Sequence, residues 1–452
     1  MTSGTSENGH AQFSVIIVGS GIAGLVLAML LEKACIPYDI YERATEVTSL
    51  GSAIFFNATT AKLFKQCGIY EDMMKIAKLT PSIQIANEKR EVEYTLDFEE
   101  AVNMFGSSGY IVSRPMLYDL LRRQVPHERI HMGKKVINVQ QTEDHVEIEF
   151  QDGSTASGDI LVGADGAYSV VRQKLYAHLK GKNQLPASDA VPLPFSTVCL
   201  VGQTRPLDPE VFPNLKIEGC QFIRTLGDNK PYTWTYFTTQ QKTVAFMVIH
   251  YLNEVSSKEN GSTSNIDWGP EAAEIMCNQV RDFPIISGGD KPLSVGDLID
   301  WTPKELISKV MLEEKVFQTW HHGRAVLVGD ACHKLSPAGG SGANCAIHDS
   351  LCLANRLNAL SEKPTRAEIE KAFQAYRDER IPWVEAANNS SLIFKTMVEQ
   401  MIRMTHYQPM CAYLPLIEDK GTIKSVHQES LHDTLPIVEL RRKAKEAAVS
   451  AL

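Results

Sequence analysis

The chain has 452 residues, of which 44% are hydrophobic and 22% charged, a balance that excludes disordered and collagen-like proteins. Its formal net charge is −9, which argues against nucleic acid as a partner, because binding to a phosphate backbone needs clustered Lys and Arg. The 9 cysteines include no C-x-x-C pair, so neither a disulfide framework nor a metal site is expected. A reducing, cytoplasmic location fits this composition best.

The first predicted elements form a βαβ unit. Residues 14–18 are a continuous β-branched run, which is typical of a strand buried in a parallel sheet. Residues 22–34 are predicted to form a helix and residues 38–42 a second strand. The unit has the length of a mononucleotide-binding fold.

The turn inside this unit carries the pattern Gly19-x-Gly21-x-x-Gly24. Gly19 permits a tight turn, Gly21 lets the backbone approach a pyrophosphate, and Gly24 allows close packing of helix on strand. Glu42 ends the next strand and can accept hydrogen bonds from ribose hydroxyls, so we expect FAD or NAD here rather than NADP. The same glycines argue against a membrane span over the uncharged residues 14–31.

Two later segments repeat the first half of the unit. Residues 159–162 lead into Gly-Ala-Asp-Gly at 163–166, and residues 324–328 lead into Gly-Asp at 329–330. Ligands of open α/β sheets lie beyond the carboxyl ends of the strands. We therefore expect three strand ends to surround one bound molecule.

Alternating strands interrupt this parallel pattern. Residues 146–150 alternate before the Asp152-Gly153 turn, which indicates a hairpin. Residues 192–250 are rich in strand formers and form the candidate substrate domain. Alternating aromatic residues in a strand are more often core, but four side chains here are candidates for the substrate pocket. They are Trp234, Tyr236, Phe246 and Met247.

The last part of the sequence is predicted to be helical. One helix is expected over residues 346–360, and Thr365 and Glu368 form a capping box that opens another. Residues 391–406 carry an apolar stripe that would cap a cavity, pair two subunits or touch a membrane surface peripherally. The chain is thus expected to be a monomer or a homodimer without a transmembrane span.

Segments 163–172 and 329–350, with Arg114 in Val-Ser-Arg-Pro, resemble the FAD-dependent monooxygenases of the aromatic hydroxylase type. The chain is similar to the fungal salicylate-hydroxylase-like and prenyl-epoxidase-like members, from about residue 13 to residue 382. The resemblance implies an α/β fold with α+β insertions. A Rossmann-like FAD-binding domain with a parallel sheet would be joined by an antiparallel substrate sheet and C-terminal helices.

We expect a domain division on this basis. The FAD-binding domain would comprise residues 13–80, 108–185 and 300–362, the substrate sheet residues 81–107 and 186–299, and the C-terminal helical region residues 363–452.

The resemblance also implies cofactor contacts. Asp330 matches the aspartate that binds the ribityl chain of FAD. Gly342 and Ala343 match backbone positions facing the pyrimidine end of the isoalloxazine, to which Asn344 would add. Arg114 matches a cofactor-binding arginine, and Arg43 resembles a residue beside the adenosine.

Further positions follow from the same resemblance. Asp165 and Gly166 match an element linked with the flavin pyrophosphate and with nicotinamide binding, and Arg172 is expected to be its structural ion-pair partner. Pro337 matches a proline beside the flavin, and His333 is a flavin-adjacent candidate. His333 lacks the spacing of metal ligands around it.

The implied reaction is oxygen insertion. NADPH or NADH would reduce FAD transiently, O2 would add to give a flavin C(4a)-hydroperoxide, and an apolar or aromatic small molecule of secondary metabolism would be hydroxylated or epoxidised. The sequence names no general base. A FAD-dependent oxidase or reductase without oxygen insertion, and a catalytically silent FAD-binding protein, are the alternatives.

Overall fold

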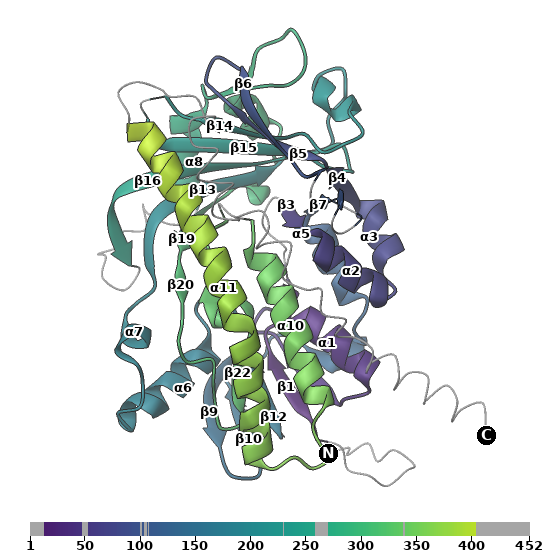
Figure 1. Cartoon of the computed structure of the whole chain (residues 1–452), viewed down its shortest axis with the longest axis vertical. Coiled ribbons are helices and arrows are strands. Elements are labelled where there is room, and N and C mark those ends of the chain that lie inside the picture. The colour runs from purple at the N-terminus through teal and green to yellow at the C-terminus, as the bar shows by residue number, and fades with distance from the viewer. Residues whose placement is uncertain are drawn as a thin grey trace, which may run out of the picture.

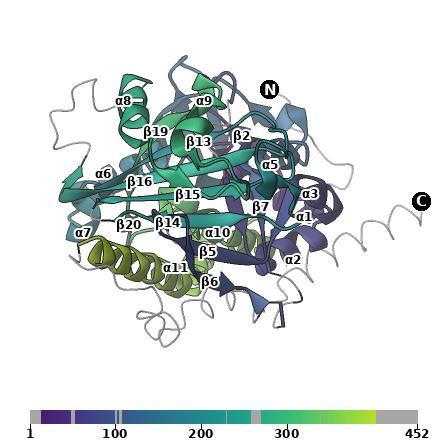
Figure 2. The same cartoon turned by 90° about the horizontal axis from the view of Figure 1, so that it is seen from above.

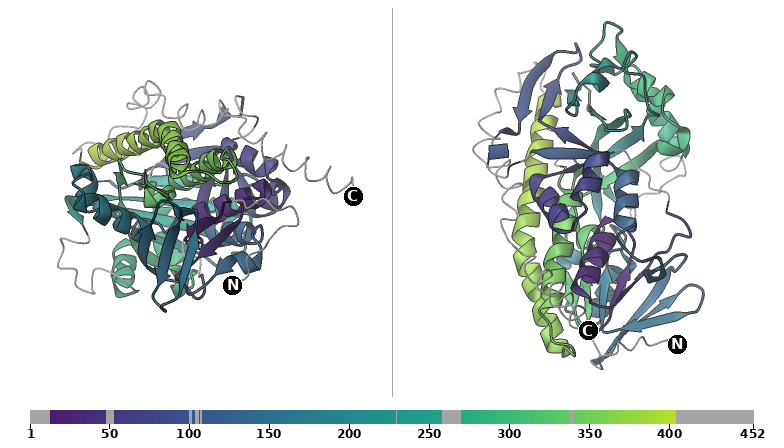
Figure 3. Two further views of the ribbon diagram at one scale, coloured as in Figure 1. Left: turned by 90° about the horizontal axis from the view of Figure 1, so that it is seen from below. Right: turned by 90° about the vertical axis from the view of Figure 1, so that its right-hand side faces the viewer.

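The computed structural model describes residues 13–47, 53–99, 102–103, 106, 108–228, 230–257, 270–337 and 340–403. A parallel sheet lies at one end of the molecule and a seven-stranded sheet at the other, as Figure 1 shows. Helices α10 (Gly342–Asn358) and α11 (Arg366–Arg403) pack against each other between them. Figure 3 shows α11 along one side of the molecule, from one sheet to the other.

The parallel sheet holds the predicted βαβ unit. Its strand order is β21-β22-β12-β1-β2-β8, and only β21 is antiparallel to its neighbour. The strands are β1 (Val15–Val18), β2 (Tyr38–Tyr41), β8 (Ile130–His131), β12 (Ile160–Gly163), β21 (His321–His322) and β22 (Ala325–Leu327). The three predicted strand ends therefore meet at one edge of the sheet.

Helix α1 (Ile22–Ala34) follows β1, and its burial explains the uncharged run in the sequence. Nearly every side chain from Ala23 to Leu31 is buried, against the sheet and against α10 and α5 (Arg114–Arg122). A helix that is apolar on all sides is stable when packing covers it all round. Among the described residues, no helix combines the length and the apolar character needed to cross a membrane.

The seven-stranded sheet has the order β19-β13-β16-β15-β14-β5-β6 and is antiparallel except between β14 and β5. Its strands are β5 (Ser82–Ala86), β6 (Val92–Asp97), β13 (Pro194–Gln203), β14 (Phe222–Leu226), β15 (Tyr232–Thr238), β16 (Val244–Ser257) and β19 (Ser308–Glu313). Helices α8 (Pro270–Val280) and α9 (Val295–Asp300) cover one face. Figure 2 shows α11 on the other side of this sheet.

Smaller sheets and further helices complete the fold. A three-stranded sheet has the order β3-β7-β4, and the predicted hairpin at Asp152 and Gly153 is found between β10 and β11. The remaining strands are β3 (Ala53–Phe56), β4 (Ala77–Thr80), β7 (Gly109–Ser113), β9 (Val136–Gln141), β10 (Val146–Phe150), β11 (Thr155–Gly158), β17 (Pro284–Ile285), β18 (Leu293–Ser294), β20 (Lys315–Val316) and β23 (His333–Lys334). The remaining helices are α2 (Ala58–Gln66), α3 (Tyr70–Ile76), α6 (Val170–Gly181) and α7 (Ala187–Ala190).

The expected mixed α/β class is confirmed. Helix α10 begins at residue 342, four residues before the predicted start. The capping box before α11 is present, because the Thr365 amide and hydroxyl donate to Glu368 at 2.8 Å each. Residues 404–452 and the side chains of residues 390–403, which include the apolar stripe, lie outside the described part.

Candidate active site

The glycine turn after β1 shows why its residues are glycines. Gly19 has φ +102°, and a Cβ there would lie 2.5 Å from the Ala164 carbonyl oxygen. A Cβ on Gly24 would lie 2.1 Å from the Gly19 carbonyl oxygen. Around Gly21, no atom lies within 4 Å of the corresponding position, and no side chain caps α1 there. The turn is thus closely packed except at the helix N-terminus, where a ligand phosphate has room and amide donors.

Glu42 lies beside this turn. Its Oε2 accepts hydrogen bonds from the Ser20 amide at 2.9 Å and the Ser20 hydroxyl at 3.0 Å. Its Oε1 accepts from the Ala44 amide at 3.0 Å. Arg43, the next residue, is exposed. Glu42 is therefore fixed at the end of β2, next to the expected adenosine site.

The third strand end carries Asp330. It follows Gly329, which has φ +59°, and its Oδ2 accepts a hydrogen bond from Lys334 Nζ at 2.6 Å. The negative charge of Asp330 raises the pKa of Lys334, whereas the nearby charge of Arg114 acts in the opposite direction. The charges of Asp330 and Arg114, two expected cofactor contacts from distant parts of the sequence, thus both act on this lysine.

Asp165 at the end of β12 caps a helix. Its Oδ2 accepts from the amides of Val170 at 2.7 Å and Val171 at 3.2 Å, at the start of α6. Its Oδ1 is buried without a hydrogen-bond partner among the described residues, and burial raises the pKa of the carboxyl group. A buried acceptor of this kind has capacity for a further donor.

Arg172 has partners other than the expected one. Its guanidinium donates to the carbonyl oxygens of Ala331 at 2.8 Å and Ala167 at 2.5 Å, and it stacks on the Phe317 ring. These contacts replace the expected ion pair with Asp165, because the arginine reaches across to the turn after β22. Arg172 thereby ties the second strand end to the third.

The N-terminus of α10 is anchored by Asn344. Its Oδ1 accepts from the Asn57 amide at 3.2 Å and the Thr60 hydroxyl at 2.8 Å, and its Nδ2 donates to the Phe55 carbonyl at 2.9 Å. The side chain is thus engaged with β3 and α2, and the expected addition of Asn344 to the amides of Gly342 and Ala343 stays a prediction. A Cβ on Gly342 would meet nothing within 4 Å, so this helix end has open space beside it.

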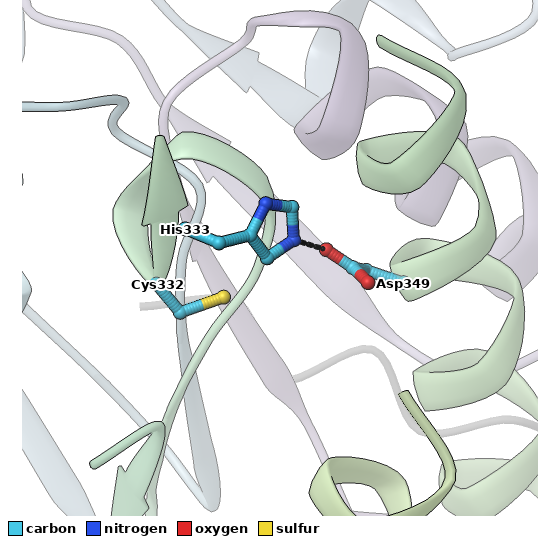
Figure 4. Close-up of side chains that lie close together, drawn as sticks. All are labelled: Cys332, His333 and Asp349. Atoms are coloured by element: carbon cyan, nitrogen blue, oxygen red, sulfur yellow. Dashed lines mark hydrogen bonds and ion pairs between the residues drawn. The ribbon is translucent and has the colours of Figure 1, made fainter. Parts of the chain in front are cut away.

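His333 is bonded to a buried carboxylate that also forms an ion pair with Arg380. Its Nε2 lies 2.5 Å from Asp349 Oδ2, as Figure 4 shows. Asp349 Oδ1 accepts from Arg380 Nε at 2.9 Å. Cys332 lies beside them, and burial raises the pKa of its thiol. Because the carboxylate oxygens are already bonded and Arg380 brings a positive charge, this group has the chemistry of an ion pair rather than of a metal centre.

Three of the four candidate pocket residues lie in the core between the seven-stranded sheet and α8 and α9. Trp234, Tyr236 and Phe246 belong to that cluster. Trp234 Nε1 donates to the Pro284 carbonyl at 2.7 Å, and the Tyr236 hydroxyl donates to the Ile286 carbonyl. These side chains thus point away from the face that packs toward the parallel sheet.

The opposite face of the sheet carries a different row of side chains. Arg224 pairs across strands with Thr235, and Thr235 pairs with Met247. Met247 packs against the same apolar cluster as Phe55, whose carbonyl is bonded to Asn344. This face therefore lies on the side of the α10 N-terminus. Met247 is the one candidate from the sequence that it includes.

Arg224 is a buried cation on this face that the sequence did not single out. It is 6% exposed, and its Nε donates to the Thr235 hydroxyl at 3.1 Å. Burial lowers the pKa of its guanidinium, which means that the surroundings disfavour the positive charge. The only signal in the sequence is its position one residue after Ile223, which faces the α8 side.

A family model described as "FAD binding domain" matches residues 12–205 and 296–391. The chain belongs to this FAD binding domain family. The match covers the glycine turn, all three strand ends and α10. The expected cofactor, FAD, is confirmed, as is the recognition of a FAD-dependent monooxygenase.

Relatives and solved structures agree with this membership. The FAD-dependent monooxygenase nodM of Hypoxylon pulicicidum is 27% identical, over 91% of this chain and 87% of the relative. PenM of Penicillium crustosum is 29% identical, over 84% and 77%. The fold is shared with Klebsiella pneumoniae HpxO complexed with FAD and uric acid, at TM-score 0.68 and 20% identity over 93% of this chain and 99% of that one.

The residues at the strand ends fit FAD. Gly21 leaves open space at a helix N-terminus, where a pyrophosphate would be bound by amides. Asp165 Oδ1 is a buried acceptor with unused capacity among the described residues. Asp330 presents a half-exposed carboxylate at the same sheet edge, which suits the hydroxyl donors of a ribityl chain.

Proposed function

We propose that this FAD-dependent monooxygenase uses NADPH or NADH and O2 to hydroxylate or epoxidise an apolar or aromatic small molecule. The observation that carries the proposal is the position of the α10 N-terminus. The three strand ends lie on one side of it. On the other side lies the sheet face with Met247, to which it is linked because Asn344 bonds to Phe55 and Phe55 packs against the same apolar cluster as Met247. A cofactor held at the strand ends would thus meet a largely apolar sheet face.

The proposed cofactor contacts follow the strand ends. Glu42 would accept from the adenosine ribose, with Arg43 beside it, and the amides after Gly21 would bind the pyrophosphate. Asp330 would bind the ribityl hydroxyls. Arg114, the first residue of α5, would support a negative cofactor group.

The amides of Gly342 and Ala343 at the start of α10 would face the pyrimidine end of the isoalloxazine. Helix N-terminal amides stabilise negative charge, and this end of the ring becomes more negative on reduction. Pro337, in the turn before α10, would lie beside the ring without reacting.

Bound FAD would supply the redox chemistry that activates O2. The residues of this chain would orient the substrate and exclude water. Met247 would offer an apolar contact, and Arg224 with Thr235 would bind an oxygen atom of the substrate. A nearby guanidinium lowers the pKa of a bound phenol, so a phenolic substrate would bind as its more electron-rich phenolate, with its proton released to solvent.

A substrate from secondary metabolism stays a prediction that follows from the resemblance noted in the sequence. A cytoplasmic location and a monomeric or homodimeric state stay predictions.

The test is a substrate screen with isotopically labelled dioxygen. Purified protein is expected to be yellow, and a substrate is expected to accelerate NAD(P)H oxidation and gain one labelled oxygen atom. Products that are oxidised without gaining the label would instead show an oxidase on the same fold. No response to any apolar or aromatic compound would contradict the proposal.

A further inference from the structure

Asp349 on α10 is bonded to both sides of the turn that carries Asp330. Its Oδ2 accepts from the Gly329 amide at 3.0 Å and lies 2.5 Å from His333 Nε2. Gly329 directly precedes Asp330, and His333 follows Asp330 three residues later. Figure 4 shows the His333 ring pointing toward Asp349. One buried oxygen atom thus holds both ends of this turn against α10.

The other oxygen of Asp349 is bonded to α11. Arg380 Nε donates to Oδ1 at 2.9 Å, and the side chain of Asp349 is completely buried. Burial alone would raise the pKa of Asp349, but the charges and hydrogen bonds of His333 and Arg380 outweigh it and lower the pKa to about 2. Asp349 therefore remains an anion throughout the range in which the protein would work.

A buried ion pair such as Asp349–Arg380 contributes little to stability, because the desolvation of both charges offsets most of their attraction. Apolar packing between α10 and α11 would stabilise the contact at least as well. The bonds from Asp349 to Gly329 and His333 give its charge a role besides stability. They fix the turn that has to hold the Asp330 carboxylate in one orientation.

We propose that Asp349 is a positioning residue for FAD, which sets the turn from Gly329 to His333 relative to α10. The Asp330 carboxylate and the Gly342 amide would then be placed to bind the same FAD molecule. The inference rests on the proposed contact of Asp330 with FAD, but not on the reaction that follows.

The test compares FAD affinity with the stability of the apoprotein. Asp349→Asn is expected to raise the Kd for FAD about 10-fold or more, and to change the visible circular dichroism of the bound flavin. Ser350→Ala is the matched control, because it removes the neighbouring bond from the Ser350 hydroxyl to the Ala23 carbonyl at 2.9 Å and leaves Asp349 intact. It is expected to lower the melting temperature of the apoprotein but to keep the Kd within about threefold.

A double variant separates the two roles of the charge. Asp349→Leu with Arg380→Met removes both charges, so the apoprotein should be more stable than Asp349→Leu alone. The FAD affinity should nevertheless stay low, because Gly329 and His333 have lost their partner. If affinity instead recovers together with stability, Asp349 is merely structural and the proposal fails.

A milder variant covers the case in which Asp349→Asn does not fold. His333→Gln leaves the bonds of Asp349 to Gly329 and Arg380 in place, and is expected to raise the Kd for FAD about threefold to 10-fold. Asp378→Asn, at an exposed position on α11, is its control and should leave the Kd unchanged. An unchanged Kd and an unchanged flavin dichroism in His333→Gln would overturn the proposal.

All of these readouts use FAD binding and need no substrate. Failure of the labelled-oxygen experiment together with weakened FAD binding in Asp349→Asn would reject the proposed reaction and leave this inference intact.

Discussion

Ser20 donates two hydrogen bonds to a single oxygen atom of Glu42, one from its amide at 2.9 Å and one from its hydroxyl at 3.0 Å. The relationship joins the glycine turn after β1 to the end of β2, 22 positions away in the sequence. The two parts of the predicted fingerprint, the pyrophosphate turn and the ribose-binding carboxylate, are therefore joined by direct hydrogen bonds.

Glu42→Gln tests this unit. A carboxamide would place its NH2 group against an N–H or O–H donor, either at Ser20 or at Ala44, and it would lose the charge that favours ribose hydroxyls. We expect the Kd for FAD to rise about 10-fold, measured by quenching of flavin fluorescence. The exposed Glu46→Gln is the control and should bind FAD like the wild type. Equal affinities of the two variants would contradict the assigned role.

Asp330→Asn tests the ribityl contact. Hydrogen bonds to charged groups contribute about 1.5–3 kcal/mol, so loss of the carboxylate should weaken FAD binding by about one to two orders of magnitude. Lys334→Met should weaken it less, because Lys334 only orients the carboxylate through its 2.6 Å bond to Oδ2. Asp144→Asn, at an exposed position, controls for net charge. A larger effect of Lys334→Met than of Asp330→Asn would show that the lysine itself binds the cofactor.

Arg224→Met and Trp234→Phe test which face of the seven-stranded sheet binds substrate. For a compound that accelerates NAD(P)H oxidation, Arg224→Met should raise KM about 10-fold and leave the Kd for FAD unchanged. Trp234→Phe removes the bond to the Pro284 carbonyl and should cost about 1 kcal/mol of stability without changing KM. If Trp234→Phe raises KM and Arg224→Met does not, the substrate binds on the α8 side of the sheet instead.

The parts of the site that the sequence predicted are those with local patterns. A buried strand that ends in glycine and a carboxylate is visible within a few residues, and parallel pairing brings such ends to one edge. This reasoning placed Gly19, Asp165 and Asp330 correctly at the same edge of one sheet.

The parts that it missed depend on long-range contacts. Arg224 and Ile223 are neighbours in one strand and so lie on opposite faces of the sheet. Only the packing of α8 against the sheet shows that Ile223 is on the helix-covered face and Arg224 on the other. The alternation in β15 indicated that Trp234 and Tyr236 share one face and could be core, but because both faces are buried it did not indicate which face packs against α8. Asn344 likewise bonds to Asn57 at a separation of 287 residues, which no local pattern reveals.

Gly329→Ala tests the turn before Asp330 against a matched glycine. Gly329 has φ +59°, and a Cβ there would lie 3.1 Å from the Ala346 Cβ and 3.3 Å from the Ala23 Cβ. Gly153, in the β10 to β11 hairpin, has φ +80° and open space around the same position. Gly153→Ala should therefore cost only the conformational penalty of about 1–2 kcal/mol and leave FAD binding unchanged.

Gly329→Ala should cost that penalty plus about 1–3 kcal/mol for the contacts with α10 and α1, because both helices are closely packed. The turn can relieve the contact only by moving Asp330 away from α10, so the Kd for FAD should rise together with the loss of stability. The measurements are chemical denaturation of the apoprotein and FAD titration of both variants. If Gly329→Ala and Gly153→Ala lose the same stability, α1 and α10 move to make room for the added methyl group. The turn is then held less rigidly than its contacts with Ala346 and Asp349 indicate.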